Sequence, residues 1–234
     1  MNKVMMVVGA VALAGVMSGC VTGGAAGEDK VAAWQKDRTP VEVLKSKIEV
    51  KAAGAIVEAL DVPVFGIYKA VADKVDGMAI EDRYRRIYLG YVADVQEMEK
   101  NGKTHDEAIK AEMDQLRAME GGEEIIANLH KYLEQTKKTN FQALLDWATK
   151  IGQDLQAAGQ TFAQESPKAL QQLLDIAQKE GGMAIMKIPS QGKDDLAVIG
   201  EQLADSGKGL ALYIEMVNAD KEAAKVQADY PVEG

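Results

Sequence analysis

The apolar residues of this chain recur every three or four positions between glycine-marked breaks, and this spacing constrains the fold more than any other feature. After the first twenty residues, no stretch shows the sustained two-residue alternation, rich in Val, Ile and Thr, that half-buried strands need. Alanine is very frequent and there are only 5 prolines. The pattern predicts an all-α protein, with several helices in an elongated bundle.

The ends of the predicted helices follow from capping signals. Thr39-Pro40-Val41-Glu42 and Thr104-His105-Asp106-Glu107 are typical of capping boxes, and Ser166-Pro167 indicates a third helix start. Glycine-containing pairs near 77, 102, 121, 181 and 207 predict helix ends. Together these signals predict helices near residues 28–38, 40–60, 63–76, 80–100, 105–120, 123–138, 141–165, 167–180, 194–206 and 208–227.

Several glycines fall inside these predicted helices, at positions 54, 66, 90, 152, 159, 200 and 209. Each costs a helix about 1 kcal/mol relative to Ala. Since the chain is rich in small residues and only 5% aromatic, we interpret these glycines as points of close helix packing. The alternative is that they are hinges.

The first residues are typical of an export signal. One basic residue, Lys3, precedes an uncharged stretch from Val4 to Val16. As a helix this stretch would span about 20 Å, which is too short for a bilayer core of about 30 Å. It therefore fits the hydrophobic region of a signal peptide better than a transmembrane helix.

Met17-Ser18-Gly19-Cys20 follows this stretch and resembles the lipobox of bacterial lipoproteins. The resemblance implies that residues 1–19 are removed and that Cys20, the only cysteine, carries lipid chains such as palmitate. In Gram-negative lipoproteins, an Asp directly after the lipidated Cys typically retains the protein in the inner membrane. This chain has Val21 at that position, so the resemblance also implies location at the outer membrane. The alternative is an ordinary secretory signal.

The charge and the segment boundaries complete the predicted organisation. The formal net charge of −9 argues against a nucleic-acid partner and should hold the body away from anionic lipid headgroups. Residues 20–27 are predicted to form a flexible tether, 28–227 an all-helical domain, and 228–234 a disordered tail.

The sequence contains no complete catalytic or metal-binding pattern. His105 and His130 are the only histidines, and neither has a second ligand at helical spacing. Gly102-Lys103-Thr104 lacks the first glycine of a phosphate loop. Ser190 and Lys193 have the Ser-x-x-Lys spacing, but the partner motifs of such enzymes are missing. We therefore expect a protein that is not an enzyme and has no metal or cofactor.

The first candidate binding segment is Arg83 to Tyr91. Tyr84, Tyr88 and Tyr91 share one helix face, so they could form an aromatic shelf for a glycan or peptide. Arg83 and Arg86 beside it could hold a carboxylate or phosphate. Alternatively, the tyrosines belong to the core and the arginines to a solvated flank.

The second candidate is the apolar run from Met183 to Ile188, which is unusually hydrophobic for a predicted loop. Either it is a strap buried in the core, or Met183, Ile185 and Met186 form an exposed contact surface. An exposed run could contact a protein partner or enter a membrane, as in helical pore-forming proteins.

The sequence as a whole predicts a lipid-anchored protein whose body faces the periplasm. Its expected role is structural or adaptor-like: it holds an envelope protein near the outer membrane. The alternative role is a helical module that binds a hydrophobic or envelope-derived ligand or acts on membranes.

Overall fold

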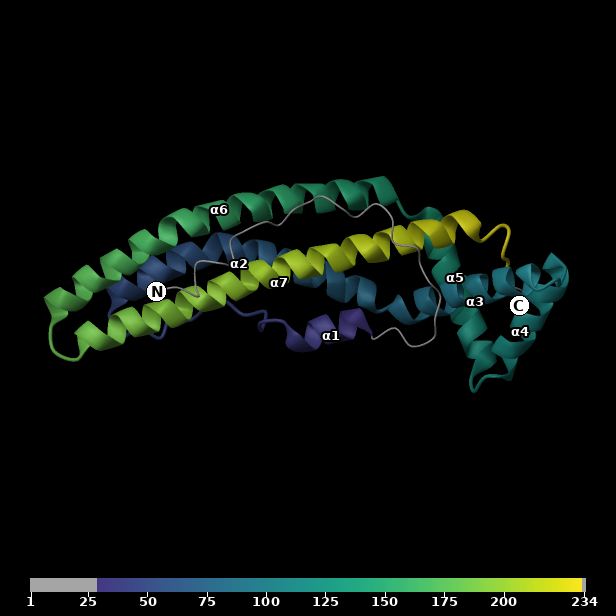
Figure 1. Ribbon diagram of the computed structural model, residues 1–234, viewed down its shortest axis with the longest axis horizontal. Coiled ribbons are helices and arrows are strands. Elements are labelled where there is room, and N and C mark those ends of the chain that lie inside the picture. Colours follow the sequence, from purple (N-terminus) through teal and green to yellow (C-terminus); the bar gives the residue numbers. More distant parts are fainter. Residues whose placement is uncertain (1–28, 233–234) are drawn as a thin grey trace. The chain divides into compact units, whose positions relative to one another are not determined.

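Seven helices account for most of residues 29–232, the part of the chain that the computed structural model describes (Figure 1). They are α1 (Lys30–Asp37), α2 (Lys51–Ala79), α3 (Asp82–Lys100), α4 (His105–Ala118), α5 (Gly122–Lys138), α6 (Phe141–Glu180) and α7 (Ala184–Val226). The described residues contain no strand, so the predicted all-α class is confirmed. The predicted signal segment, Cys20 and the tether lie outside the described residues.

The contacts between residues divide the chain into two compact units. Of the described residues, 34–74 and 148–211 belong to the first unit. The second unit contains 29–33, 75–147 and 212–232. The region expected to be one helical domain, 28–227, thus contributes to two compact units, each with a hydrophobic core of its own.

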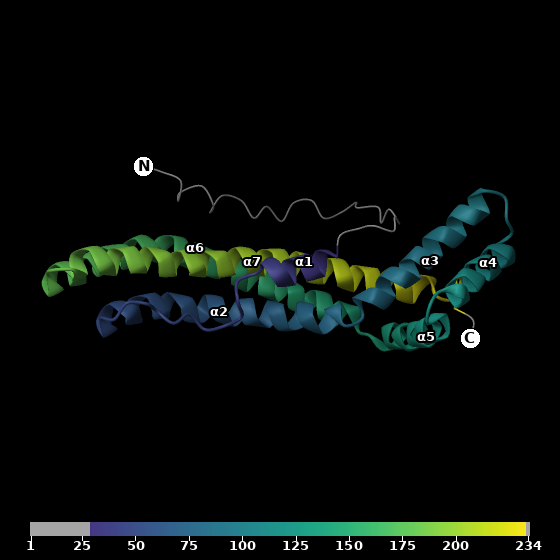
Figure 2. The same cartoon turned by 90° about the horizontal axis from the view of Figure 1, so that it is seen from below.

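The core of the first unit lies between parts of α2, α6 and α7. Figures 1 and 2 show α6 and α7 running antiparallel on either side of the turn at residues 181–183. Small and branched side chains of these three helices, and Ile48 from the irregular segment before α2, meet in this core. Its buried members are Ile48, Ala53, Val57, Val64, Leu173, Ala177, Ile188, Leu196 and Ile199. Burial of this apolar surface is the main stabilising contribution to the unit.

Residues 38–50 are not helical, and the helix predicted at 40–60 is wrong over its first half. The backbone N–H and hydroxyl of Thr39 both donate to Asp205 Oδ2 at 2.8 Å. The hydroxyl of Tyr68 donates to the carbonyl of Thr39. Because Thr39 is bonded to groups distant in the sequence, it does not cap a helix of its own, and the capping box predicted there is wrong.

Four predicted helix breaks are absent, three at prolines and one at a glycine. Pro63, Pro167 and Pro189 all lie inside continuous helices, so α2, α6 and α7 each run through one of them. At the stop predicted near Gly207, the hydroxyl of Ser206 instead donates to the Gln202 carbonyl of the same helix at 2.7 Å. A proline costs an interior helix about 3 kcal/mol, so the packed apolar faces of these helices outweigh the local penalty.

Other predicted ends are confirmed. The N–H of Glu107 donates to Thr104 Oγ1 at 3.4 Å and the N–H of Thr104 donates to Glu107 Oε2 at 3.0 Å, which completes the capping box of α4. Gly102, Gly121 and Gly181 have positive φ angles at or beside helix ends.

The glycines inside the helices divide into two groups. At Gly209 of α7, an added Cβ would lie 2.5 Å from Trp34 Cζ2, so this glycine does mark a close approach. At Gly66, Gly90 and Gly159, an added Cβ would meet nothing within 4 Å. The close-packing interpretation therefore holds for some of these positions and is wrong for those three.

The second unit packs α3, α4 and α5 against the end of α7 and the residues that follow it. Residues 228–232, expected to belong to a disordered tail, are packed onto this core. The hydroxyl of Tyr88 donates to the Tyr230 carbonyl at 3.1 Å, and that of Tyr91 to the Pro231 carbonyl at 2.8 Å. Val232 is buried in the same core. Buried tyrosine hydroxyls need acceptors, and these carbonyls supply them.

None of the helices within residues 29–232 combines the length and the hydrophobicity needed to cross a membrane.

Candidate functional site

The tyrosines of the predicted aromatic shelf lie in the core of the second unit. Tyr88 and Tyr91 are 0% and 2% exposed, and their rings stack with centroids 6.0 Å apart. Tyr84 is half-buried and packs against the same core. A glycan needs exposed ring faces, so the structure favours the alternative interpretation, in which these tyrosines belong to the core.

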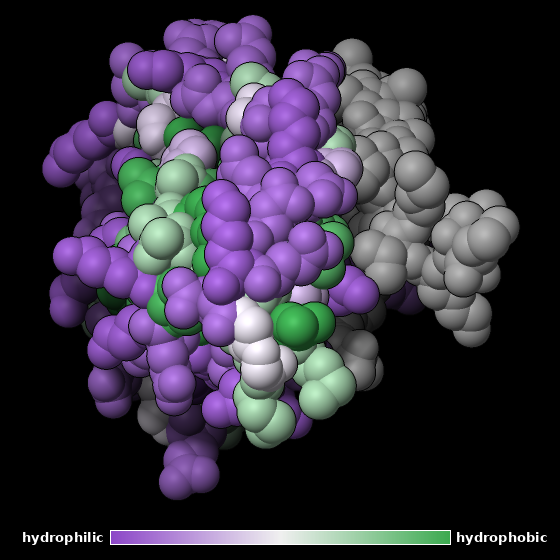
Figure 3. Space-filling model, turned by 90° about the vertical axis from the view of Figure 1, so that its left-hand side faces the viewer, coloured by the Kyte–Doolittle hydropathy of each residue, from purple (hydrophilic) through white to green (hydrophobic). Residues whose placement is uncertain are grey.

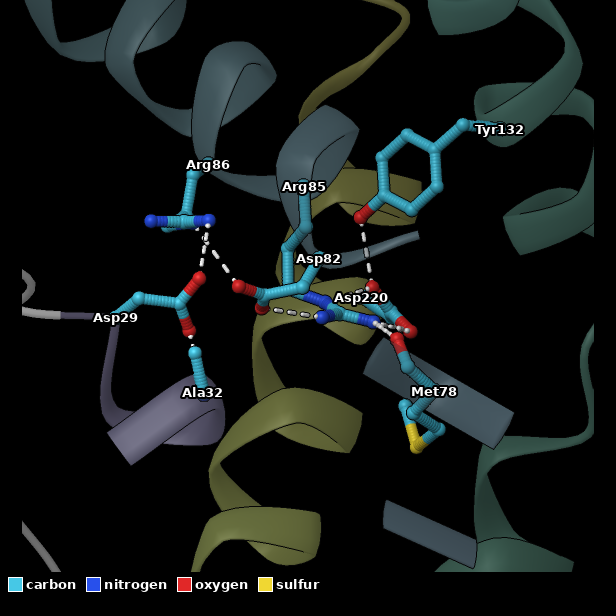
Figure 4. Close-up of polar contacts among 8 residues, drawn as sticks. All are labelled: Asp29, Ala32, Met78, Asp82, Arg85, Arg86, Tyr132 and Asp220. Carbon is cyan, nitrogen blue, oxygen red and sulfur yellow. Dashed lines mark hydrogen bonds and ion pairs between the residues drawn. The ribbon is translucent and has the colours of Figure 1, made fainter. Parts of the chain in front are cut away.

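Arg85, which the sequence analysis did not single out, is the buried arginine of this segment (Figure 4). Its Nε and Nη2 donate to the two carboxylate oxygens of Asp220 at 2.6 and 3.1 Å. Its Nη1 donates to Asp82 Oδ1 at 2.8 Å, and the hydroxyl of Tyr132 donates to Asp220 Oδ1 at 2.7 Å. The one available signal was its spacing: Arg85 lies one helical turn before buried Tyr88 and therefore on the same face.

This buried network keeps its charges paired. Burial on its own lowers the pKa of Arg85, but the hydrogen bond and charge of Asp220 outweigh it and raise that pKa above its usual value. Burial, followed by the charge of Asp220, raises the pKa of Tyr132. The guanidinium is therefore charged and the phenol neutral at physiological pH. Since both carboxylates are already bound to Arg85, we assign the network a structural role.

The two arginines that the sequence analysis proposed as ligand clamps lie on the surface. Arg83 is exposed. Arg86 pairs through Nη2 with Asp29 at 3.1 Å and through Nε with Asp82 at 2.9 Å (Figure 4). The other oxygen of Asp29 accepts the N–H of Ala32 at 2.9 Å, at the start of α1. The Arg86 guanidinium thus already binds two carboxylates of the protein. An arginine that binds an anionic ligand would need its guanidinium free, so the structure does not favour the predicted ligand-binding role of Arg86.

Met183, Ile185 and Met186 lie on the surface of the first unit, where α6 turns into α7. Their exposed fractions are 68%, 51% and 71%. The turn is made by Gly181 and Gly182, both with positive φ, and α7 already begins at Ala184. Figure 3 looks onto this end and shows hydrophobic residues at the surface among hydrophilic ones.

Of that apolar run, only Ile188 is anchored deep in the core, at 2% exposure. The buried-strap interpretation is therefore wrong for Met183, Ile185 and Met186, because the helical path turns their side chains away from the core that Ile188 enters. We call these three residues the apolar tip; they are the candidate functional site.

His105 links the start of α4 to the C-terminal residues of the second unit. Its Nδ1 lies 2.6 Å from Glu99 Oε1, and its Nε2 lies 2.8 Å from the Asp229 carbonyl. The hydrogen bond with Glu99, then that with Asp229, raises the pKa of His105. Two acceptors beside one ring favour the doubly protonated imidazolium. We call this pair of contacts the His105 clamp, because it holds the segment around Asp229 against the start of α4.

Across residues 29–232, no group of three or more His, Cys, Asp and Glu side chains is placed to hold a metal ion. Comparison of the chain with protein-family models, curated proteins and solved structures found no significant match.

Proposed function

We propose that this protein is a lipid-anchored, non-catalytic adaptor that holds an envelope protein near the outer membrane, with its body in the periplasm. The exposed apolar tip carries the proposal. Isolated apolar residues are common on protein surfaces, but three large ones within four positions at a helix turn favour a contact with another molecule. Methionine suits such contacts because its flexible thioether adapts to different partner surfaces.

The anchor in this proposal is Cys20, supported by the resemblance of Met17-Ser18-Gly19-Cys20 to a lipobox. Two or three acyl chains give stable anchoring, at about 0.8 kcal/mol per buried methylene, whereas a single chain binds reversibly. The net charge of −9 favours a body that stands away from anionic headgroups, where a protein partner is within reach.

The anchor is tested by growing cells with an alkyne-tagged fatty acid. We expect the wild-type protein to be labelled and Cys20→Ser to be unlabelled. An unlabelled wild-type protein would remove the anchor from the proposal.

The contact surface is tested by placing a photo-crosslinking amino acid at Met183 or Met186 in cells. Gln153, exposed on α6 of the same unit, is the matched control position. We expect one defined protein adduct from the tip positions and none from Gln153. Properly localised protein that gives no tip adduct contradicts the adaptor role.

The same tip supports the second candidate function, insertion into membranes, because Met and Ile are readily buried in lipid. Leakage of dye from phosphatidylethanolamine–phosphatidylglycerol vesicles, caused by Cys20→Ser protein and abolished by a Met183→Ser/Met186→Ser variant, would favour it. Intact vesicles would leave the protein contact as the role of the tip.

A further inference from the structure

A small pocket in the first unit has a buried acid, Asp61, among its lining residues. It has a volume of about 370 Å³ and lies between the irregular segment 43–46 and α2. Its lining residues are Val43, Leu44, Lys45, Ser46, Glu58, Asp61 and Val62. Asp61 is 1% exposed, which is unusual for an aspartate, and a buried carboxylate needs polar partners to compensate for lost hydration.

The compensation is incomplete. Asp61 Oδ2 accepts the backbone N–H of Leu44 at 3.2 Å. The other oxygen, Oδ1, has no hydrogen-bond partner among the residues that the structure describes. Glu58 lies one helical turn earlier on the pocket lining and adds a second negative charge.

The pKa of Asp61 is raised, as expected for a buried carboxyl group with no cation beside it within residues 29–232. Burial, together with the charge of Glu58, raises the pKa of Asp61, and the hydrogen bond from Leu44 only partly opposes this. Lys45 lies on the lining, but its ammonium makes no ion pair with Asp61 or Glu58 in the described part of the chain. A cation at this place would remove both the charge repulsion and the unmet hydrogen bond.

Two of the lining residues are apolar and exposed. These are Val43 and Val62, which are 56% and 67% exposed. The pocket lining thus combines apolar valines with the carboxylates of Glu58 and Asp61. Lysine and arginine side chains match this combination, because each has a hydrocarbon stem that ends in a charged head. The stem would cover the two valines while the head reaches the carboxylates.

We propose that this pocket binds the ammonium or guanidinium group of a basic side chain presented by the protein partner. The partner in this inference rests on the adaptor function proposed above, whereas the pocket itself does not. Because Oδ1 of Asp61 is covered, binding in this proposal requires segment 43–46 to shift so that the head group can reach it. That segment is irregular, and the bond from Leu44 to Asp61 is a long one.

The first test is an NMR titration of the full chain carrying Cys20→Ser. The probes are the Nα-acetyl N-methylamides of lysine and arginine, and the corresponding norleucine derivative is the neutral control. We expect both cationic probes to bind with millimolar affinity and to shift the Leu44 amide and the Asp61 carboxyl carbon. Norleucine should shift neither. Absence of shifts with both cationic probes overturns the proposal.

Asp61→Asn is the matched variant, because an amide oxygen still accepts the N–H of Leu44 while the charge is gone. We expect it to weaken probe binding at least tenfold, and Glu58→Gln to weaken it less. Asp73→Asn removes an exposed acid of the same helix and should leave binding unchanged. Equal binding by wild type and Asp61→Asn contradicts the assignment.

Lys45→Gln tests whether the chain fills its own pocket. Probe binding by Lys45→Gln but not by wild type would show that Lys45 is the resident cation and would overturn the partner assignment. The two proposals can fail separately. Tip adducts without probe binding remove the pocket and leave the adaptor, whereas probe binding without any tip adduct removes the adaptor and leaves the pocket.

Discussion

Replacing Gly209 with Ala should destabilise the first unit, although alanine is the better helix former. The added Cβ would lie 2.5 Å from Trp34 Cζ2 and 2.8 Å from Val71 Cγ1. Non-bonded carbon atoms are most stable at about 3.5–4.0 Å, so the neighbours must retreat by about 1 Å. Trp34 is 6% exposed and its indole N–H donates to the Asp205 carbonyl at 3.2 Å, which limits how far the ring can move.

The magnitude follows from three contributions to the free energy of unfolding. Overpacking of a well-packed core costs about 1–3 kcal/mol. Weakening the hydrogen bond of Trp34 costs about 1 kcal/mol. The gain in helix propensity from Gly to Ala returns about 1 kcal/mol. We expect a net loss of about 1–3 kcal/mol.

Gly200→Ala is the matched control in the same helix. Its added Cβ would have Phe162 Cε1 as the nearest neighbour, at 3.9 Å, which is an ordinary contact. It should therefore stabilise the unit by up to about 1 kcal/mol. Urea denaturation of both variants in the Cys20→Ser chain, followed by circular dichroism, measures the difference. A Gly209→Ala protein as stable as Gly200→Ala would refute the close approach of α7 to Trp34.

Four further predictions concern single side chains. Tyr88→Ala should lower the free energy of unfolding by about 3–5 kcal/mol, because it empties a fully buried site; thermal denaturation near the wild-type temperature would restore the exposed-shelf interpretation. Asp220→Asn should lower the free energy of unfolding by about 3–5 kcal/mol, because it leaves the buried Arg85 without its main partner. Asp73→Asn, which replaces an exposed acid, should lower it by less than about 1 kcal/mol; urea denaturation measures both. His105→Asn should lower stability by less than about 1 kcal/mol at acidic pH. Because the folded pKa of His105 is raised above 6.5, this stabilisation is complete below pH 6.5 and is lost as pH rises through the folded pKa; a pH-independent difference between variant and wild type would disprove the clamp. Asp61 has a folded pKa raised above 3.8, so its ionisation reduces stability as pH rises from 3.8 through the folded pKa. Asp61→Asn should therefore be more stable than wild type at neutral pH, and denaturation curves at acidic and neutral pH check this.

Features that depend on neighbours along the chain could be predicted from the sequence. The all-α class follows from apolar spacing, and the start of α4 from the reciprocal bonds of Thr104 and Glu107. The positive φ angles at Gly102, Gly121 and Gly181 follow from the absence of a side chain. Each of these signals acts over a few residues, so no knowledge of the packed structure is required.

The candidate site was only partly predictable. Met183, Ile185 and Met186 were recognisable as an unusual apolar run, but a run of this composition fits a buried strap as well as an exposed tip. The choice depends on how the turn at Gly181 and Gly182 directs the start of α7, which is a property of the packed helices.

Tertiary structure alone decided where distant polar groups meet. Asp205 accepts from Thr39 across 166 positions of sequence, and Asp61 accepts from Leu44. Thr39 was predicted to cap a helix and Leu44 to lie inside that helix, but the stretch is irregular. Arg85 and Asp220 are 135 positions apart, so no local pattern identifies them as a pair. The physical reason is that a buried polar group must find a partner wherever packing brings one within reach, and this requirement overrides local helix propensity.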